Sequence, residues 1–345
     1  MAVYQISSTD AARKVAYEEK VYRRTQRASF FEKFMGDSQE SMIWRRRVFN
    51  KEKGDQIYFY ELAALDPTMV IRNGANDLRS RAQKLSHNSM SVTLGEVALP
   101  AATRTKGSID WQRCVFDIDK ETEEAVVSTG AKAFDLDIFA AITGSSAFRT
   151  VWGGDATSTA TLAATDTITP EFLTRIKYKA LTGERTSVSS NTMVYEPVKP
   201  IMIDGMKHLV LLAPSEACYD LERNTEFLQA TREAEVRGKD NPLFKGAKLV
   251  WNGVIVHPYD ELKITALTGG TGGDVPYCNS YLLGASAICA SICNRPEIRV
   301  DIDDFEKIAY YAWASIHGFG ATIFNSIPRG IMKCTTACTN LYGLS

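Results

Sequence analysis

The side chains best suited to metal chemistry in this sequence are its seven cysteines. Two pairs have Cys-x3-Cys spacing, Cys289/Cys293 and Cys334/Cys338. Four cysteine thiolates are a set that zinc accepts, but neither pair has the two-residue spacing of common zinc knuckles. Cys289 and Cys293 also lie in an apolar run without a nearby histidine. Because an odd cysteine count without a visible signal peptide is typical of reduced thiols, we expect buried cysteines and no metal or cofactor.

The four histidines are isolated along the chain: His87, His208, His257 and His317. No spacing such as His-Glu-x-x-His occurs, and His208 and His257 lie at the ends of expected strands, where a hydrogen-bonded structural histidine is common. Ser215 lacks the glycines two residues to either side that a nucleophile elbow needs. Triads assemble in space, so a soluble hydrolase around Ser215 or His257 remains a minor alternative. We expect no catalytic residues and no enzymatic activity.

The charge and apolar content of the 345 residues argue against a dedicated nucleic-acid binder and against a protein that spans a membrane. The 40 lysines and arginines nearly cancel the 41 acidic residues, giving a net charge of −1, whereas a dedicated nucleic-acid binder is normally basic. No segment approaches the roughly eighteen apolar residues that span a bilayer. With 45% hydrophobic residues, the chain can bury a large core in two or three lobes.

Residues 1–53 form a distinct N-terminal arm. A helix is expected from a cap at Ser8 or Thr9 to a stop at Gly36, with Phe30 and Phe34 among its apolar residues. Twelve lysines and arginines face seven acidic residues in the arm, a net charge of +5. Two interpretations remain open, a contact with an acidic partner surface and a solvated helix face.

Residues 54–98 are expected to form a long β-hairpin. Gln56–Leu62 is rich in aromatic and β-branched residues, and Met90–Leu94 alternates apolar and polar side chains. The segment 72–81 between them is too polar to be buried. Because a projecting hairpin cannot bury its own faces, we expect a neighbouring subunit to complete it.

Residues Ser108 to Thr143 are the clearest helix, with Gly144 after its end. Apolar or small residues recur at steps of three and four along it: Trp111, Val115, Ile118, Thr122, Ala125, Thr129, Ala133, Leu136 and Ala140. Eight acidic residues against three basic ones give this helix a net charge of −5. The arm or hairpin of one subunit could therefore lie against this helix of another, although solvation of both is an equal alternative.

An Asn-Gly pair marks a tight hairpin in the second half of the chain. Asn252-Gly253 separates two apolar runs, and both residues accept the positive φ of a type I′ turn. Further helices are expected to begin at Thr169-Pro170 and at Ser215, on either side of a buried strand at His208–Leu212. Helices interspersed with strands that are not sequential neighbours indicate an α+β fold.

Several of these elements occur in an order that resembles the major capsid proteins of tailed bacteriophages. They are the strand entry Lys53-Gly54-Asp55, the helix end Asp135–Gly144, the block Asn241–Gly246 with its Asn-Gly hairpin, the strand Leu282–Ala285, and Gly318-Phe319-Gly320. The expected hairpin tip and the cysteine-bearing tail from Cys334 to Ser345 match no pattern of that family.

The resemblance implies the Hong Kong 97-type fold, with an N-terminal arm, an extended loop, a peripheral domain and an axial domain. The arm would be residues 1–53 and the extended loop 54–98. The peripheral domain with its spine helix would be 99–195, completed by 245–262 and 296–333. The axial domain would be 196–244 and 263–295, leaving 334–345 as a C-terminal tail.

The resemblance also implies a function and its partners. It predicts a structural subunit that self-assembles into pentamers and hexamers of an icosahedral head around double-stranded DNA, with no sequence-specific DNA binding. Portal, scaffolding and decoration proteins would be partners, with assembly in the host cytoplasm and no membrane contact. The alternative within the same fold is the shell protein of a cellular nanocompartment.

Overall fold

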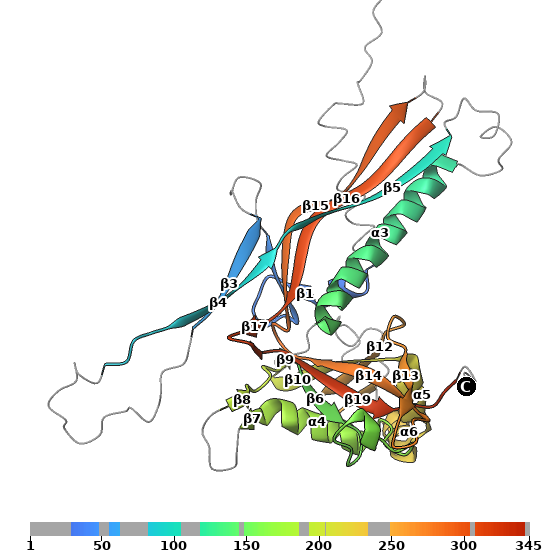
Figure 1. Ribbon diagram of the computed structural model, residues 1–345. Coiled ribbons are helices and arrows are strands. Elements are labelled where there is room, and N and C mark those ends of the chain that lie inside the picture. The colour runs from blue at the N-terminus through green and yellow to red at the C-terminus, as the bar shows by residue number, and fades with distance from the viewer. Residues whose placement is uncertain are drawn as a thin grey trace, which may run out of the picture.

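The computed structural model has two large β-sheets that meet at a buried junction, one long helix, and a hairpin that extends away from the body (Figure 1). No helix in the part of the chain that the structure describes is both long and apolar enough to cross a membrane. The described residues are 29–47, 55–62, 82–104, 118–144, 148–185, 193–203, 205–233, 249–303 and 308–341.

The first sheet has five strands in the order β1-β2-β15-β16-β5. Their bounds are Met35–Gly36, Ile43–Arg47, Ile288–Asp303, Ile308–Ala321 and Gly95–Arg104. β15 and β16 form its long antiparallel centre, and β2 pairs with β15 in parallel. The described end of the arm is therefore a 3-10 turn, η1 (Phe31–Phe34), followed by strands, where the sequence predicted a helix up to Gly36. The expected helix start at Ser8 or Thr9 lies outside the described residues.

Helix α3 (Ile118–Thr143) lies along β5 and β16 (Figure 1). The residues that it buries are Val126, Val127, Gly130, Ala131, Phe134, Asp135, Ile138 and Ile142. The predicted apolar stripe is therefore wrong, because Ala125, Thr129 and Leu136 lie on the exposed side. The predicted stripe includes small residues as if they were apolar. The large side chains of the neighbouring row bury more surface, and they determine which face of the helix packs against the sheet. The predicted start at Ser108 lies outside the described residues.

The second sheet follows the order β11-β12-β10-β14-β19-β6. These strands are Leu249–Trp251, Val254–Pro258, Met206–Ala213, Val275–Leu283, Ile331–Ala337 and Arg149–Trp152. Two more complete it at its margins, β9 (Ile201–Ile203) beside β10 and β13 (Ile264–Gly269) beside β14. The predicted Asn-Gly turn is confirmed: β11 and β12 pair across Asn252 and Gly253, whose φ angles are 44° and 80°. The preceding block 241–246 lies outside the described residues.

Three helices belong to the second sheet: α4 (Pro170–Thr182), α5 (Ser215–Arg223) and α6 (Thr225–Glu233). The predicted starts of α4 and α5 are confirmed. The Thr169 side chain caps α4 by accepting a hydrogen bond from the Phe172 N–H, and proline stands at the first helical position. A further 3-10 turn, η3 (Thr159–Thr161), contacts β13.

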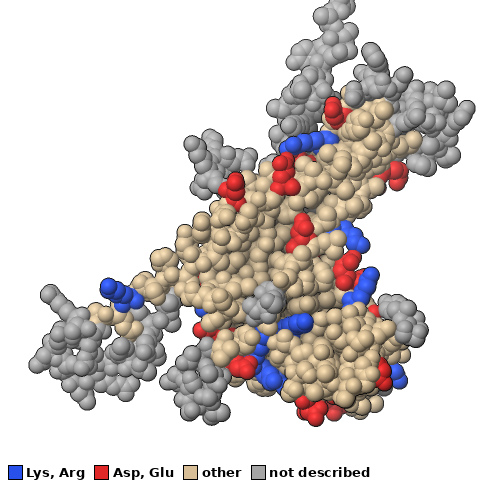
Figure 2. Space-filling view, viewed as in Figure 1, with Lys and Arg blue, Asp and Glu red and all other residues tan. Residues whose placement is uncertain are grey.

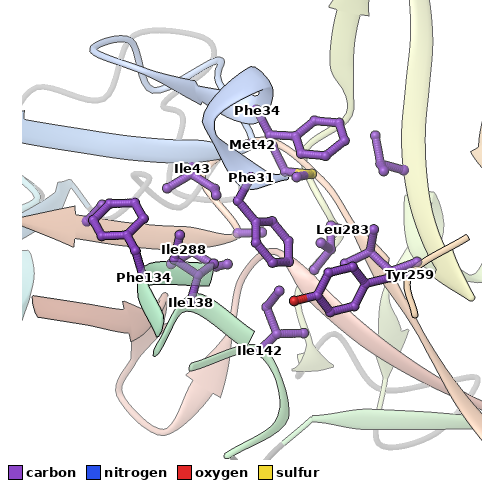
Figure 3. Packing of buried hydrophobic residues seen from close by; sticks show 14 of the residues in the cluster. Phe31, Phe34, Met42, Ile43, Phe134, Ile138, Ile142, Tyr259, Leu283 and Ile288 are labelled. Carbon is purple, nitrogen blue, oxygen red and sulfur yellow. The ribbon is translucent and has the colours of Figure 1, made fainter. Parts of the chain in front are cut away.

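Strand β10 shows how the second sheet is buried on both faces. Leu209 and Leu211 point into one core with α4 and α5, whereas Val210 and Leu212 point into the other core. This second core is the junction between the two sheets. Figure 3 shows it built from the N-terminal segment, α3, β15 and the second sheet: Phe31, Phe34, Met42, Ile43, Phe134, Ile138, Ile142, Tyr259, Leu283 and Ile288.

The expected long hairpin is confirmed in its paired part. β3 (Gln56–Leu62) pairs antiparallel with β4 (His87–Thr93), which begins three residues earlier than predicted. The polar segment 72–81 lies outside the described residues. Two shorter pairs also form, β7 (Glu184–Arg185) with β8 (Met193–Tyr195) and β17 (Ile323–Phe324) with β18 (Ile327–Pro328).

The strand pairing of several segments could not be read from the order of the chain. Residues 249–258 and 149–152 pair in the second sheet, not in the sheet beside α3. Residues 288–295 begin β15, which belongs to the first sheet. Residues 331–337 form β19 inside the second sheet, so the start of the expected tail is a buried strand. Sheet partners were not readable from chain order because both sheets are assembled from distant segments.

Candidate assembly surfaces

The outer face of the β3–β4 hairpin presents large side chains to solvent. Tyr58, Tyr60 and Leu62 alternate along β3 and are 48%, 55% and 69% exposed. The rings of Tyr58 and Tyr60 stack with centroids 6.4 Å apart, and the His87 ring meets Tyr60 edge-on at 6.0 Å. Aromatic rings of this kind provide contact area at protein interfaces.

The inner face of the same hairpin is anchored to the first sheet. Phe59 is fully buried beside Val92 and Cys289, and the Trp44 ring of β2 lies 4.9 Å from the Phe59 ring. The Arg46 side chain also donates to the Tyr58 carbonyl at 2.7 Å. The hairpin is therefore held to the body by one face, while the face with the tyrosines is exposed in the part of the chain that the structure describes.

A groove of about 520 Å3 runs between β5 and the first half of α3. Its lining is mostly apolar or small: Leu99, Pro100, Ala101, Ile118, Glu121, Thr122, Ala125, Val126 and Thr129. Four residues of the wrongly predicted stripe thus line an exposed groove: Ile118, Thr122, Ala125 and Thr129. Small side chains leave space at this surface of the helix, so another chain segment can approach it closely.

The acidic character of the helix persists in its described part. Six acidic residues stand there against Lys120 and Lys132, and Lys132 forms an ion pair with Glu261 at 2.9 Å. Figure 2 shows acidic side chains scattered over the upper body, with basic ones between them. Charge and small side chains together make the helix surface suitable for a basic or aromatic segment.

Asp135 ties the N-terminal segment to α3 inside one subunit. Its carboxylate accepts hydrogen bonds from the Ser29 hydroxyl at 2.5 Å and from the backbone N–H groups of Phe30 and Phe31 at 2.7 and 3.3 Å. Burial raises the pKa of Asp135 above its usual 3.8, although these donors act in the opposite direction. In its described part, the N-terminal segment is thus joined to α3 at Asp135 by one hydroxyl and two backbone N–H donors.

The residues considered for chemistry are dispersed. Five of the described cysteines are buried, as predicted, whereas Cys293 is only half-buried: Cys218, Cys278, Cys289, Cys334 and Cys338 are the buried ones. Burial raises the pKa of the Cys289 thiol to about 11 and that of Cys334 to about 12, so both remain protonated at neutral pH. Among the described residues, no three histidine, cysteine or acidic side chains gather as a metal site would require. Cys114 lies outside them.

Ser215 and His257 do not face each other. Ser215 begins α5 on one side of the second sheet. His257 pairs with Leu212 and points to the opposite side, where its buried ring lies 5.2 Å from the Phe34 ring. The structure therefore does not support the hydrolase arrangement considered from the sequence.

His317 has a structural environment that its isolated position in the sequence did not reveal. Its Nε2 lies 2.9 Å from a carboxylate oxygen of Asp137 on α3, and its Nδ1 lies 3.0 Å from the Ser315 hydroxyl. The rings of Phe134 and Phe319 enclose it at 5.0 and 5.1 Å. This histidine joins helix to sheet, and no spacing in the sequence places Asp137 beside it.

Comparisons with known proteins agree with this architecture. Residues 149–337 match a family described as phage capsid protein. The major capsid protein of Pseudomonas phage KPP25 is 24% identical over 91% of this chain and 90% of its own length. Among solved structures, the capsid of Ralstonia phage GP4 has a TM-score of 0.78 at 19% identity, covering 99% of this chain and 97% of that one. The capsid of cyanophage Pam1 has a TM-score of 0.71 at 17% identity, covering 98% and 96%.

The family match spans more than half of the chain, and the fold matches extend over nearly all of it. These structural matches show the Hong Kong 97-type fold. The chain therefore belongs to the phage capsid protein family and is a major capsid protein, a structural component of the virion.

Proposed function

We propose that copies of this subunit assemble into pentamers and hexamers of an icosahedral head that encloses double-stranded DNA. The observation that carries this proposal is the aromatic outer face of the β3–β4 hairpin, with Tyr58 and Tyr60 about half exposed. A surface of this kind is costly to leave in water and is typical of a contact with another chain. We assign the second sheet with α4, α5 and α6 to the axial domain, and the first sheet with α3 to the peripheral domain.

The contact between neighbours joins the outer hairpin face of one subunit to the α3–β5 groove of the next. The groove supplies an apolar, small-sided floor at Ala101 and Ala125, next to the acidic side chains of α3. The hairpin segment supplies the tyrosines and, in its sequence, the bases Arg72, Arg79 and Lys84. Many such modest contacts add up to a stable shell because each subunit makes several of them.

The near-neutral chain suits a container for DNA. A strongly basic lining would bind phosphates and release counterions at each contact, which would hinder movement of the DNA. We therefore infer enclosure without sequence-specific binding. As a shell component, the subunit is proposed to have a structural role and no enzymatic activity. Portal and scaffolding proteins, and decoration proteins where the head carries them, are the further partners, and assembly takes place in the host cytoplasm.

Electron microscopy of the purified protein tests the proposal. Negative-stain images, with a scaffolding protein present if assembly requires one, are expected to show capsomers or closed shells. A monodisperse monomer under every assembly condition would contradict it. Mass spectrometry and nucleic-acid analysis of purified particles then separate a DNA-filled head from a nanocompartment, which would hold a cargo protein instead.

A further inference from the structure

A short turn beside the projecting hairpin contacts both of its strands. β17 and β18 are joined by Asn325 and Ser326, whose φ angles are 49° and 63°. Positive φ at both central residues is the feature of a type I′ turn, and serine adopts it less readily than asparagine or glycine. The turn and Arg329, which follows it, are here called the clasp.

The clasp forms hydrogen bonds with both residues of one cross-strand pair of the hairpin. Glu61 on β3 is paired with Asn88 on β4. The Arg329 guanidinium donates to a Glu61 carboxylate oxygen at 2.9 and 3.2 Å. The Asn325 side-chain amide donates to the Asn88 side-chain oxygen at 2.8 Å. Both strands are therefore held next to the last described pair, Leu62 with His87.

The other side of the clasp is anchored in the body of the subunit. The remaining amino group of Arg329 lies 3.2 Å from a carboxylate oxygen of Glu196, between β8 and β9. The Arg329 backbone N–H donates to the Thr322 carbonyl, and the Thr322 N–H donates to the carbonyl of Ala287 in the junction core. Arg329 can bridge two carboxylates because its planar group presents several donors in fixed directions.

We infer that the clasp is a positioning device that sets the direction in which the hairpin leaves the subunit. The described end of the hairpin extends away from the body, and β17 lies close to β4 (Figure 1). A small change of angle at this point displaces a distant contact by a larger distance. The clasp therefore selects the orientation that reaches a neighbour, an inference that rests on the proposed assembly function.

The test compares variants that loosen the clasp without disturbing the core. Asn325→Gly keeps a residue that accepts positive φ but removes the amide that reaches Asn88. Arg329→Met removes the charge and the hydrogen-bond donors but keeps much of the apolar stem of the side chain. Arg329→Lys retains the charge without the fork that bridges Glu61 and Glu196. Arg299→Met is the matched control, because Arg299 pairs with Glu297 on β15, away from the hairpin.

Hydrogen exchange of the full-length, unassembled subunit is the first measurement. We expect amides of β3 and β4 to exchange roughly three- to tenfold faster in Arg329→Met and Asn325→Gly, less in Arg329→Lys, and at the wild-type rate in Arg299→Met. Circular dichroism is expected to remain that of the wild type. Unchanged exchange in Asn325→Gly and Arg329→Met, or the same increase in Arg299→Met, would overturn the inference.

Electron microscopy of assembled material is the second measurement. The two loosened variants are expected to give open or irregular shells where the wild type and Arg299→Met give uniform ones. Uniform shells from the loosened variants would overturn the inference even if exchange is faster. If the wild type itself never assembles, the proposed function fails, whereas the exchange experiment still decides whether the clasp holds the hairpin.

Discussion

Strand β10 and strand β3 represent two opposite ways of completing a β-strand. From Leu209 to Ala213, every residue of β10 is at most 1% exposed, with neighbouring strands on both edges and a core on each face. In β3, Phe59 is buried but Tyr58 and Tyr60 on the other face are about half exposed. β10 finds all of its partners within its own chain. In β3 only the face with Phe59 is packed inside the subunit, so its outer face is available to a second subunit. Mutations in β10 should therefore affect folding, whereas mutations on the outer face of β3 should affect assembly.

The sharpest contrast comes from Leu211→Ala in β10. Leu211 is fully buried in the core under α4 and α5, so removing its side-chain atoms leaves a cavity. We expect a loss of about 2–5 kcal/mol in the free energy of unfolding. Denaturant unfolding of the unassembled subunit measures this loss. Leu211→Met, which nearly conserves volume, should cost less than about 1.5 kcal/mol. Equal losses in the two variants would show that the core is not tightly packed around this residue.

Gly130→Ala tests whether α3 also depends on partners inside the chain. A Cβ atom at Gly130 would lie 2.6–2.7 Å from the fully buried indole ring of Trp313 on β16. Alanine raises intrinsic helix stability by about 1 kcal/mol, but overpacking typically costs about 1–3 kcal/mol. We expect a net loss of stability in thermal unfolding, with Ser128→Ala on the exposed side near neutral. A Gly130→Ala variant more stable than the wild type would mean that α3 can shift away from β16 without losing much packing energy.

The sequence predicted the elements that depend on residues close together in the chain. It did not predict contacts and pairings between residues far apart in the chain. The caps of α4, the Asn252-Gly253 turn and the β3–β4 hairpin follow from residues within a few positions of each other, and all are confirmed. The close contact between Gly130 on α3 and Trp313 on β16 depends instead on a distant partner, because no local pattern connects these two residues. The pairing of β2 with β15 likewise joins residues far apart in the chain. The candidate surface was predictable as an unsatisfied hairpin, but its groove and clasp were not.

Asp135→Asn weakens the contact between arm and helix by a smaller amount. The new amide would place a donor against the N–H of Phe30 or Phe31, so we expect a loss of about 1–2 kcal/mol. Burial raises the pKa of Asp135 in the folded subunit, so protonation of this carboxyl group stabilises the fold. This stabilisation is fully present below pH 3.8, the usual pKa of the group. This contribution is lost as the pH rises through the raised value. The advantage of the wild type over Asp135→Asn should therefore shrink across that window.

Denaturant unfolding at several pH values from 3.8 upward measures this change. Glu121→Gln on the exposed part of α3 is the control, with an expected effect within about 0.5 kcal/mol at each pH. A gap between wild type and Asp135→Asn that widens as the pH rises would contradict the assigned direction of the pKa shift.

Tyr60→Ser has the smallest expected effect on stability and bears most directly on the comparison. Among the described residues, the Tyr60 ring has ring contacts with Tyr58 and His87 on the exposed side of the hairpin. Cross-strand contacts of this kind contribute about 0.2–1 kcal/mol, so the unfolding free energy should change by no more than that.

Assembly of the Tyr60→Ser variant is expected to fail, because the ring is a contact that only a second subunit can complete. Tyr178→Ser on α4, where the tyrosine is 58% exposed against 55% for Tyr60, is the matched control and should still form shells in electron micrographs. Normal shells from Tyr60→Ser would mean that β3, like β10, has all the partners it needs within its own chain.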